Sequence, residues 1–162
     1  LSFGTPVVTL RPFNTFGPRQ SARAFIPTII SQAVAQPEIR MGALTPERDM
    51  TFVSDTVAGF IAACTAPAIE GLTLNLGTGE THTIRWFTQR ILQLMEIDKP
   101  VIEESQRLRP ADSEVLKLVS DNRLAKERLS WTPRVSLDDG LMRAIRFVQH
   151  NPHFYRTDKY VK

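Results

Sequence analysis

Cysteine and long hydrophobic runs are scarce in this sequence of 162 residues. Its one cysteine, Cys64, has no partner for an internal disulfide, and a reducing cytoplasm is the compartment that fits such a chain best. Val57, Phe60, Ile61 and Cys64 follow one another at helical spacing, so we expect Cys64 to be a small thiol in the core and not a nucleophile. No apolar run approaches the roughly 20 residues of a membrane-spanning helix, so no membrane partner is predicted.

The patterns of common catalytic and metal sites are also missing. His82, His150 and His153 do not stand at metal-ligand spacing and have no cysteine partners, so no metal site is predicted. Glu103 and Glu104 are adjacent, and adjacent side chains on a strand point to opposite faces, so they cannot act together as an acid/base pair. No serine, histidine and aspartate arrangement is visible either. We therefore predict no catalytic residue in this chain.

A glycine turn, Gly77-Thr78-Gly79, carries part of a dinucleotide-binding fingerprint. Glycines between a strand and a helix allow a pyrophosphate to approach the N-terminus of the helix. The expected third glycine is missing, because position 82 is histidine, and no acidic residue ends a following strand at the usual distance. We interpret this segment as an ordinary strand–turn–helix connection and not as an NAD-binding loop.

The overall composition is that of a globular protein. The chain is 42% hydrophobic and 23% charged, with a net charge of +3. This mild basicity permits nucleic acid as a partner without requiring it, but the arginines are spread over separate turns and no aromatic stacking platform is present. No nucleic-acid partner is predicted, although a noncatalytic nucleotide-binding module remains an alternative.

Strands and helices alternate along the chain, which predicts the α/β class without internal repeats. Apolar runs predict the strands, and apolar residues at intervals near 3.6 predict the helices. The tail, 151–162, is polar and expected to be loose. The predicted strands are 6–13, 39–44, 50–53, 72–77 and 99–104, and the predicted helices are 24–35, 54–64 (with Ser54 or Asp55 as cap), 84–97, 121–129 (capped by Asp121) and 136–148.

Several polar residues at predicted turns are candidates for binding an anion. Arg48 lies between two strands and Arg109 precedes a proline, so a fixed guanidinium at either position could bind a diphosphate bidentately. Solvated surface arginines remain the alternative for each position. The full set is Asn14, Arg19, Arg23, Arg48, Arg107 and Arg109.

Six segments in order carry a resemblance to a known family: RPFNTFGPRQ, AFIPTII, GALTPERDMTFVSDTVAGF, LNLGTGE, RPADSEV and LSWTPRVSLDDGL. Over nearly its whole length the chain resembles the C-terminal, substrate-binding half of an extended short-chain dehydrogenase/reductase of the NAD-dependent epimerase/dehydratase family. It is most similar to UDP-N-acetylglucosamine 4,6-dehydratase-like enzymes, and GDP-mannose dehydratases share part of the turn GALTPERD.

The resemblance implies one C-terminal portion over 1–162, with strands near 6–13 and 72–76 that complete a Rossmann-type parallel sheet. A small mixed α/β lobe would bind the substrate. The first residues, LSFG, include neither an initiator methionine nor a charged signal-peptide start. We expect the N-terminal half, which would bind most of the NAD, to be absent from this chain.

The resemblance also implies a role for particular residues. Pro12 and Phe13 would lie near the nicotinamide end of the cofactor. The implied substrate-binding residues are Asn14, Arg48 and Arg109 for the diphosphate, Phe25, Ile26, Ile39 and Met41 for the nucleotide pocket, and Asn75 and Asp112 for the ribose or phosphates of a nucleotide-diphosphate sugar.

The implied reaction is 4,6-dehydration, in which hydride passes from sugar C4 to NAD, water leaves across C5 and C6, and hydride returns to C6. The tyrosine–lysine pair that this route requires belongs to the missing half. Tyr155 and Lys159 have the right spacing by coincidence, because they follow Pro152 at the polar end of the chain. The chain alone is expected to be inactive, and the complete enzyme to be a cytoplasmic homodimer.

Other reactions of the same family remain open. A nucleotide-sugar 4-epimerase, a UDP-glucuronate decarboxylase and a GDP-mannose 4,6-dehydratase would use the same diphosphate-binding residues. The residues that distinguish them would lie upstream of Leu1.

Overall fold

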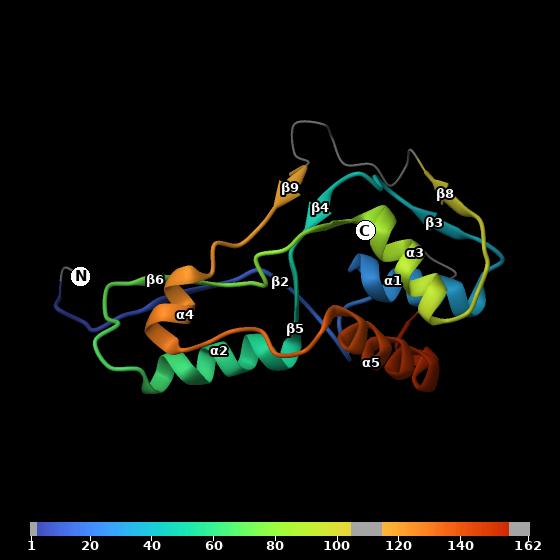
Figure 1. The fold of residues 1–162 in the computed structure, drawn as a ribbon. Helices are drawn as coiled ribbons and strands as arrows, with labels where there is room; N and C mark the ends of the chain where they lie inside the picture. The colour runs from blue at the N-terminus through green and yellow to red at the C-terminus, as the bar shows by residue number, and fades with distance from the viewer. Residues whose placement is uncertain (1–2, 105–114, 156–162) are drawn as a thin grey trace.

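The computed structural model describes residues 3–104 and 115–155, which form two lobes. Each lobe contains its own cluster of buried apolar side chains. Figure 1 shows the lobes side by side, with the chain passing between them several times. Helices and mainly parallel strands make up both lobes, so the predicted α/β class is confirmed.

The first lobe is built on a pair of parallel strands, in which Thr9 pairs with Thr73. Two helices pack on the face of this pair that carries Leu74 and Leu76, both fully buried. The loop residue Trp131 completes the cluster. The elements are β1 (Thr9–Pro12), β6 (Thr73–Leu76), α2 (Val53–Thr65) and α4 (Arg123–Leu129).

The second lobe is mainly helical. Its core includes Ile29, Ile30, Phe87, Ile91 and Leu141, none of which exposes any surface. A short parallel pair lies along one side of it (Figure 1). The elements are α1 (Phe25–Ala35), α3 (Ile84–Leu94), α5 (Leu137–His150), β3 (Ile39–Met41) and β8 (Val101–Glu103), followed by a 3-10 turn, Pro152–Phe154.

Short strands join the lobes. One parallel pair consists of β2 (Asn14–Phe16) and β5 (Met50–Phe52). In a second small sheet β4 (Glu47–Arg48) lies between β7 (His82–Thr83), which is antiparallel to it, and β9 (Lys117–Leu118), which is parallel. These strands bring residues near positions 14, 48, 82 and 118 together, and the candidate site lies beside them.

Two of the five helices described begin with a side-chain cap. The Thr83 hydroxyl accepts a hydrogen bond from the Trp86 N–H at the start of α3, and the Ser136 hydroxyl accepts one from the Asp139 N–H at the start of α5. The predicted cap of α2 is wrong, because this helix begins after Phe52 and without a side-chain cap. The predicted cap of α4 is one residue early, because Asn122 occupies the N-cap position.

The expected position of Cys64 is also wrong. Cys64 is exposed, and so are Val57 (50%), Phe60 (44%) and Ile61 (62%) along the same stripe of α2. The helix instead packs on the sheet through its small residues. A Cβ atom on Gly59 would lie 2.7 Å from a Leu76 methyl group, which shows how closely the helix backbone approaches β6.

One residue of the C-terminal tail, Tyr155, is packed and not loose, although Pro152, His153 and Phe154 before it are exposed. Tyr155 is 7% exposed and belongs to the apolar cluster of the second lobe. This burial raises the pKa of its hydroxyl. Residues 156–162 lie outside the described residues, Lys159 among them.

Among the helices of the described residues, none has the length and hydropathy needed to cross a bilayer. Within the same residues, no three histidine, cysteine, aspartate or glutamate side chains come together as they would around a metal ion.

Candidate functional site

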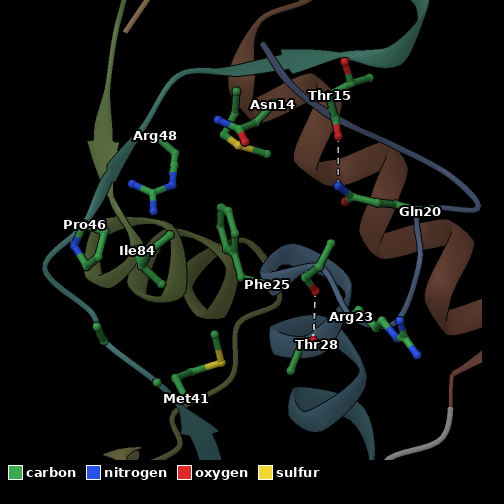
Figure 2. A pocket seen from close by; sticks show the side chains of 14 residues that line it. Asn14, Thr15, Gln20, Arg23, Phe25, Thr28, Met41, Pro46, Arg48 and Ile84 are labelled. Carbon is green, nitrogen blue, oxygen red and sulfur yellow. Dashed lines mark hydrogen bonds between the residues drawn. The ribbon is translucent and has the colours of Figure 1, made fainter. Parts of the chain in front are cut away.

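A cavity of about 430 Å³ opens between the short strands and the second lobe. Its walls come from β2, β4, the end of β3 and the N-terminal ends of α1 and α3. Figure 2 shows Arg48 and Asn14 at one end, Phe25 in the middle and Met41 at the opposite end. Arg23 and Thr28 lie to one side of this line, on the Met41 side of Phe25, so the cavity also carries polar groups away from Arg48.

The apolar part is formed by Phe25, Met41, Pro46 and Ile84. The Phe25 ring is held in place by an edge-on contact with Phe87, with 5.3 Å between the ring centroids. Because Phe87 is fully buried, Phe25 presents a fixed aromatic surface to the cavity. Such a surface suits a flat ring.

The polar end is fixed by hydrogen bonds to the backbone. One Arg48 guanidinium nitrogen, Nη1, donates to the carbonyls of Glu47 at 2.9 Å and Val115 at 2.6 Å. The Asn14 side-chain amide donates to the Asp49 carbonyl at 3.3 Å. A guanidinium has five N–H donors and an amide has two, so the groups at this end of the cavity are of the kind that an anionic ligand accepts hydrogen bonds from.

The charge of Glu47 does not face this end. Glu47 and Arg48 are adjacent on β4, so their side chains point to opposite faces. A hydrogen bond from the Thr81 hydroxyl at 2.6 Å and an ion pair with Lys117 at 3.0 Å keep the pKa of Glu47 below its usual range. Glu47 is therefore anionic at neutral pH, with its charge taken up on the other side of the strand.

The glycine turn binds an anion, but one supplied by the chain itself. The Asp49 side chain is fully buried, and its Oδ1 accepts hydrogen bonds from the Thr78 N–H (2.8 Å) and hydroxyl (2.6 Å). Its Oδ2 accepts hydrogen bonds from the N–H groups of Gly79 (2.9 Å) and Ser120 (3.0 Å). A Cβ on Gly77 would lie 2.8 Å from Oδ2 and 2.4 Å from the Ser120 Cβ, so only glycine fits there. The turn joins β6 to β7 and α3, as interpreted from the sequence, and its donors are occupied.

Sequence reasoning missed Asp49. The available signal was the turn itself, because two successive N–H donors beside a glycine commonly bind an anion. An aspartate flanked by Arg48 and a strand was a candidate for that anion, but no periodicity pointed to it.

Four of the substrate-binding residues predicted from the sequence line this one cavity: Asn14, Phe25, Met41 and Arg48. The anion candidate Arg23 also lines it, together with Gln20 and Thr28, which the sequence had not suggested. Two predicted residues of the nucleotide pocket, Ile26 and Ile39, are buried in the core and do not line the cavity.

The other predicted residues lie elsewhere. Pro12 and Phe13 line a small open hollow with Asn14 and Leu118. Asn75 lines a separate surface hollow, and its amide donates to the Asp121 carbonyl at 3.2 Å. Arg19 is exposed. Arg107, Arg109 and Asp112 lie outside the described residues.

Comparison with known proteins gives this geometry a context. The family model for GDP-mannose 4,6 dehydratase matches residues 1–144. The chain is 30% identical over 151 residues to an uncharacterized UDP-glucose epimerase, YtcB, of Bacillus subtilis, covering 91% of this chain and 46% of that protein. It is 29% identical over 161 residues to UDP-glucuronic acid decarboxylase 1 of Xenopus tropicalis, covering 98% of this chain and 37% of that protein.

A solved structure agrees with these matches. The crystal structure of UDP-glucuronic acid 4-epimerase from Bacillus cereus, in complex with UDP-glucuronic acid and NAD, aligns with a TM-score of 0.83 at 26% identity. The alignment covers 91% of this chain and 46% of the epimerase. The chain thus spans less than half the length of each of these three proteins. By its sequence and its fold, this chain belongs to the NAD-dependent epimerase/dehydratase family of the extended short-chain dehydrogenase/reductase type.

Proposed function

We propose that this chain forms the nucleotide-sugar-binding part of an NAD-dependent nucleotide-sugar epimerase or dehydratase. The observation that carries the proposal is that one cavity holds Arg48 and Asn14 together at one end and the apolar side chains of Phe25 and Met41 beyond them. A nucleoside diphosphate has the same division, with an apolar aromatic base and an anionic diphosphate.

In this proposal the base packs against Phe25 and Ile84, and the diphosphate accepts hydrogen bonds from Arg48 and Asn14. Charged hydrogen bonds from a guanidinium are the strongest available to a phosphate in such a site. The Bacillus cereus epimerase, whose printed ligands are UDP-glucuronic acid and NAD, supports a UDP-sugar as the first ligand to test.

NAD, when bound, supplies the hydride acceptor of this chemistry. The chain fits only one part of that cofactor. Pro12 and Phe13 offer an apolar contact beside Asn14, whereas the donors of the Gly77-Thr78-Gly79 turn are occupied by Asp49 and leave no place for a pyrophosphate. We propose that most of the cofactor is bound by a part of the protein outside this chain.

Two surfaces of the first lobe support the proposal that further parts of the protein pack against this chain. The β1–β6 pair is a two-stranded parallel sheet, and parallel strands normally lie inside larger sheets covered on both faces. The apolar stripe of α2, formed by Val57, Phe60 and Ile61, is exposed beside it. We propose that further strands pair with the outer edge of β1 and that a helix covers the stripe, so that this chain completes a Rossmann-type sheet.

We propose two candidate reactions for the complete protein, dehydration first and epimerisation second. Loss of water across C5 and C6, predicted from the sequence, is supported by the match to the GDP-mannose 4,6 dehydratase family model. Epimerisation at C4 is the second candidate, because the Bacillus relatives are named as epimerases. Product analysis with the complete protein separates the two, because dehydration gives a 4-keto-6-deoxy sugar and epimerisation a stereoisomer of unchanged mass. The homodimer and the cytoplasmic location stay predictions of the resemblance.

Calorimetric titration of this chain with UDP-glucose, UDP-glucuronic acid, UDP-N-acetylglucosamine, GDP-mannose and dTDP-glucose tests the binding proposal. We expect saturable binding of at least one UDP-sugar, weakened about 10- to 100-fold by Arg48→Ala because a charged hydrogen bond contributes about 1.5 to 3 kcal/mol. Arg146→Ala is the matched control, since Arg146 is an exposed arginine of α5 that does not line the cavity. No heat with any of these ligands would refute the proposal.

A further inference from the structure

We propose that Asp49 is a positioning residue for the nucleotide-sugar site. In this inference, which rests on the proposed function, the buried carboxylate fixes the backbone that orients Asn14 and carries Arg48. Asp49 itself does not line the cavity.

The side chain of Asp49 joins three parts of the chain that are far apart in sequence. Its two oxygens accept four hydrogen bonds from Thr78, Gly79 and Ser120, which lie 29 to 71 residues away. A carboxylate has about four acceptor positions, so all of them are used. The backbone at position 49 is thereby fixed against the turn after β6 and the segment after β9.

The backbone of Asp49 passes this constraint to the cavity. Its N–H donates to the Leu118 carbonyl at 3.0 Å, and its carbonyl accepts the Asn14 side-chain amide at 3.3 Å. With one amide hydrogen bound to a fixed carbonyl, the second hydrogen of Asn14 has a defined direction. Arg48 precedes Asp49 on the same backbone, and its guanidinium bonds Val115 in the segment that leads into β9.

A second buried aspartate provides a matched comparison. Asp55 is 5% exposed, and its Oδ2 accepts the N–H groups of Arg134 (3.0 Å) and Val135 (2.9 Å). These hydrogen bonds hold the loop that contains Arg134 and Val135 against α2. Neither Asp55 nor these two partners line the cavity. A carboxylate that only stabilises the fold should behave like Asp55.

The substitution Asp49→Asn keeps the size of the side chain and removes the charge. Whichever way the new amide is turned, its NH₂ group faces two of the four donors, so the turn or residue 49 must move. Asp55→Asn removes a buried charge away from the cavity, but its amide oxygen can take the place of Oδ2 and still accept both N–H groups. Asp49→Asn should therefore lower the unfolding temperature more than Asp55→Asn, and only Asp49→Asn should change the site.

Two readouts separate positioning from stability, each measured on this chain in the wild type, Asp49→Asn and Asp55→Asn. The first is the NMR signal pair of the Asn14 side-chain amide, identified by its loss in Asn14→Ala. The second is the affinity for UDP-glucose. We expect Asp49→Asn to shift or broaden the Asn14 signals and to weaken the binding of UDP-glucose by about 10-fold or more. Asp55→Asn should leave the Asn14 signals and the affinity for UDP-glucose nearly unchanged.

A double-mutant cycle adds a direct test of the coupling. If Asp49 acts through Asn14, Asp49→Asn should weaken binding less in the Asn14→Ala background than in the wild type. Should Asp49→Asn fail to fold, Thr78→Val removes one of the four hydrogen bonds and should change both readouts in the same direction to a smaller extent.

Asn14 signals that do not move in the folded variant, or equal losses of affinity in Asp49→Asn and Asp55→Asn, would overturn the inference. If the wild type does not bind UDP-glucose, that result bears on the proposed function, and the Asn14 signals still decide whether Asp49 positions the side chain.

Discussion

Gly140 is a point of close contact between α5 and the strands β2 and β5. It lies in the first turn of α5, against the buried pair Phe16 and Phe52, whose rings meet edge to face with 5.5 Å between centroids. A Cβ at this position would lie 2.7 Å from Phe16 Cζ and 2.9 Å from Phe52 Cδ2. In Gly140→Ala a gain in helix propensity is therefore opposed by the cost of crowding the core.

The two effects have opposite signs and known sizes. Replacing glycine by alanine in a helix favours folding by up to about 1 kcal/mol. Forcing an extra carbon into a packed core costs about 1 to 3 kcal/mol, and here neither ring can swing away, because both are buried. We expect a net loss of about 1 to 2 kcal/mol, which lowers the unfolding temperature of a chain of this size by roughly 2 to 8 °C.

Thermal unfolding followed by circular dichroism measures this loss. The control is the pair Phe16→Leu and Phe16→Leu/Gly140→Ala, because leucine lacks the ring atom Cζ that makes the closest contact. In that background the propensity gain should outweigh the remaining crowding, so that alanine costs less or even stabilises. A higher unfolding temperature for Gly140→Ala alone, or the same shift in both backgrounds, would refute the packing argument.

Three further outcomes are expected. The Arg90 guanidinium keeps the pKa of Asp138 below its usual range. The stability that this pair contributes is therefore present above the unfolded pKa, near 3.9, and is lost as the pH falls through the lower folded pKa. Asp138→Asn should be less stable than the wild type at pH 7, by a small amount because the pair is partly exposed, and the difference should vanish in strong acid. Cys64 should react with a thiol reagent in the native chain about as fast as in the unfolded chain, and strong protection would show that something covers the α2 stripe. Tyr155→Phe should leave turnover of the complete protein intact, because Tyr155 is packed in the core, and a loss of several orders of magnitude would make it catalytic.

Helical periodicity was the most reliable signal in the sequence. The last helix was expected at 136–148 and is found at Leu137–His150, and Leu141, Ile145 and Val148 on it are buried. The first helix was expected at 24–35 and is found at Phe25–Ala35. Such patterns work because a single face of each helix is buried against its own chain.

The same signal failed for α2. Its series of large apolar residues at helical spacing is exposed, while Gly59 and Ala63 face the sheet. Periodicity shows that a face is apolar but not what covers it. The resemblance implied that Ile26 and Ile39 belong to the nucleotide pocket, but both lie in the core, because neighbouring positions on one element can face the cavity or the interior.

The glycine turn shows why a motif must be tested by its hydrogen-bond partners. Gly77, Thr78 and Gly79 have the backbone donors that a phosphate would need, and the sequence argued against a phosphate because a third glycine and an acidic residue after the next strand were missing. The structure gives a more direct reason: Asp49 already accepts two backbone N–H groups of the turn. An external anion would have to displace a buried carboxylate, which would then lose the three hydrogen bonds that the turn donates without gaining water. The turn is therefore linked to Asp49, the residue before β5, and its backbone donors are not open to the anionic ligand that we propose for Arg48 and Asn14.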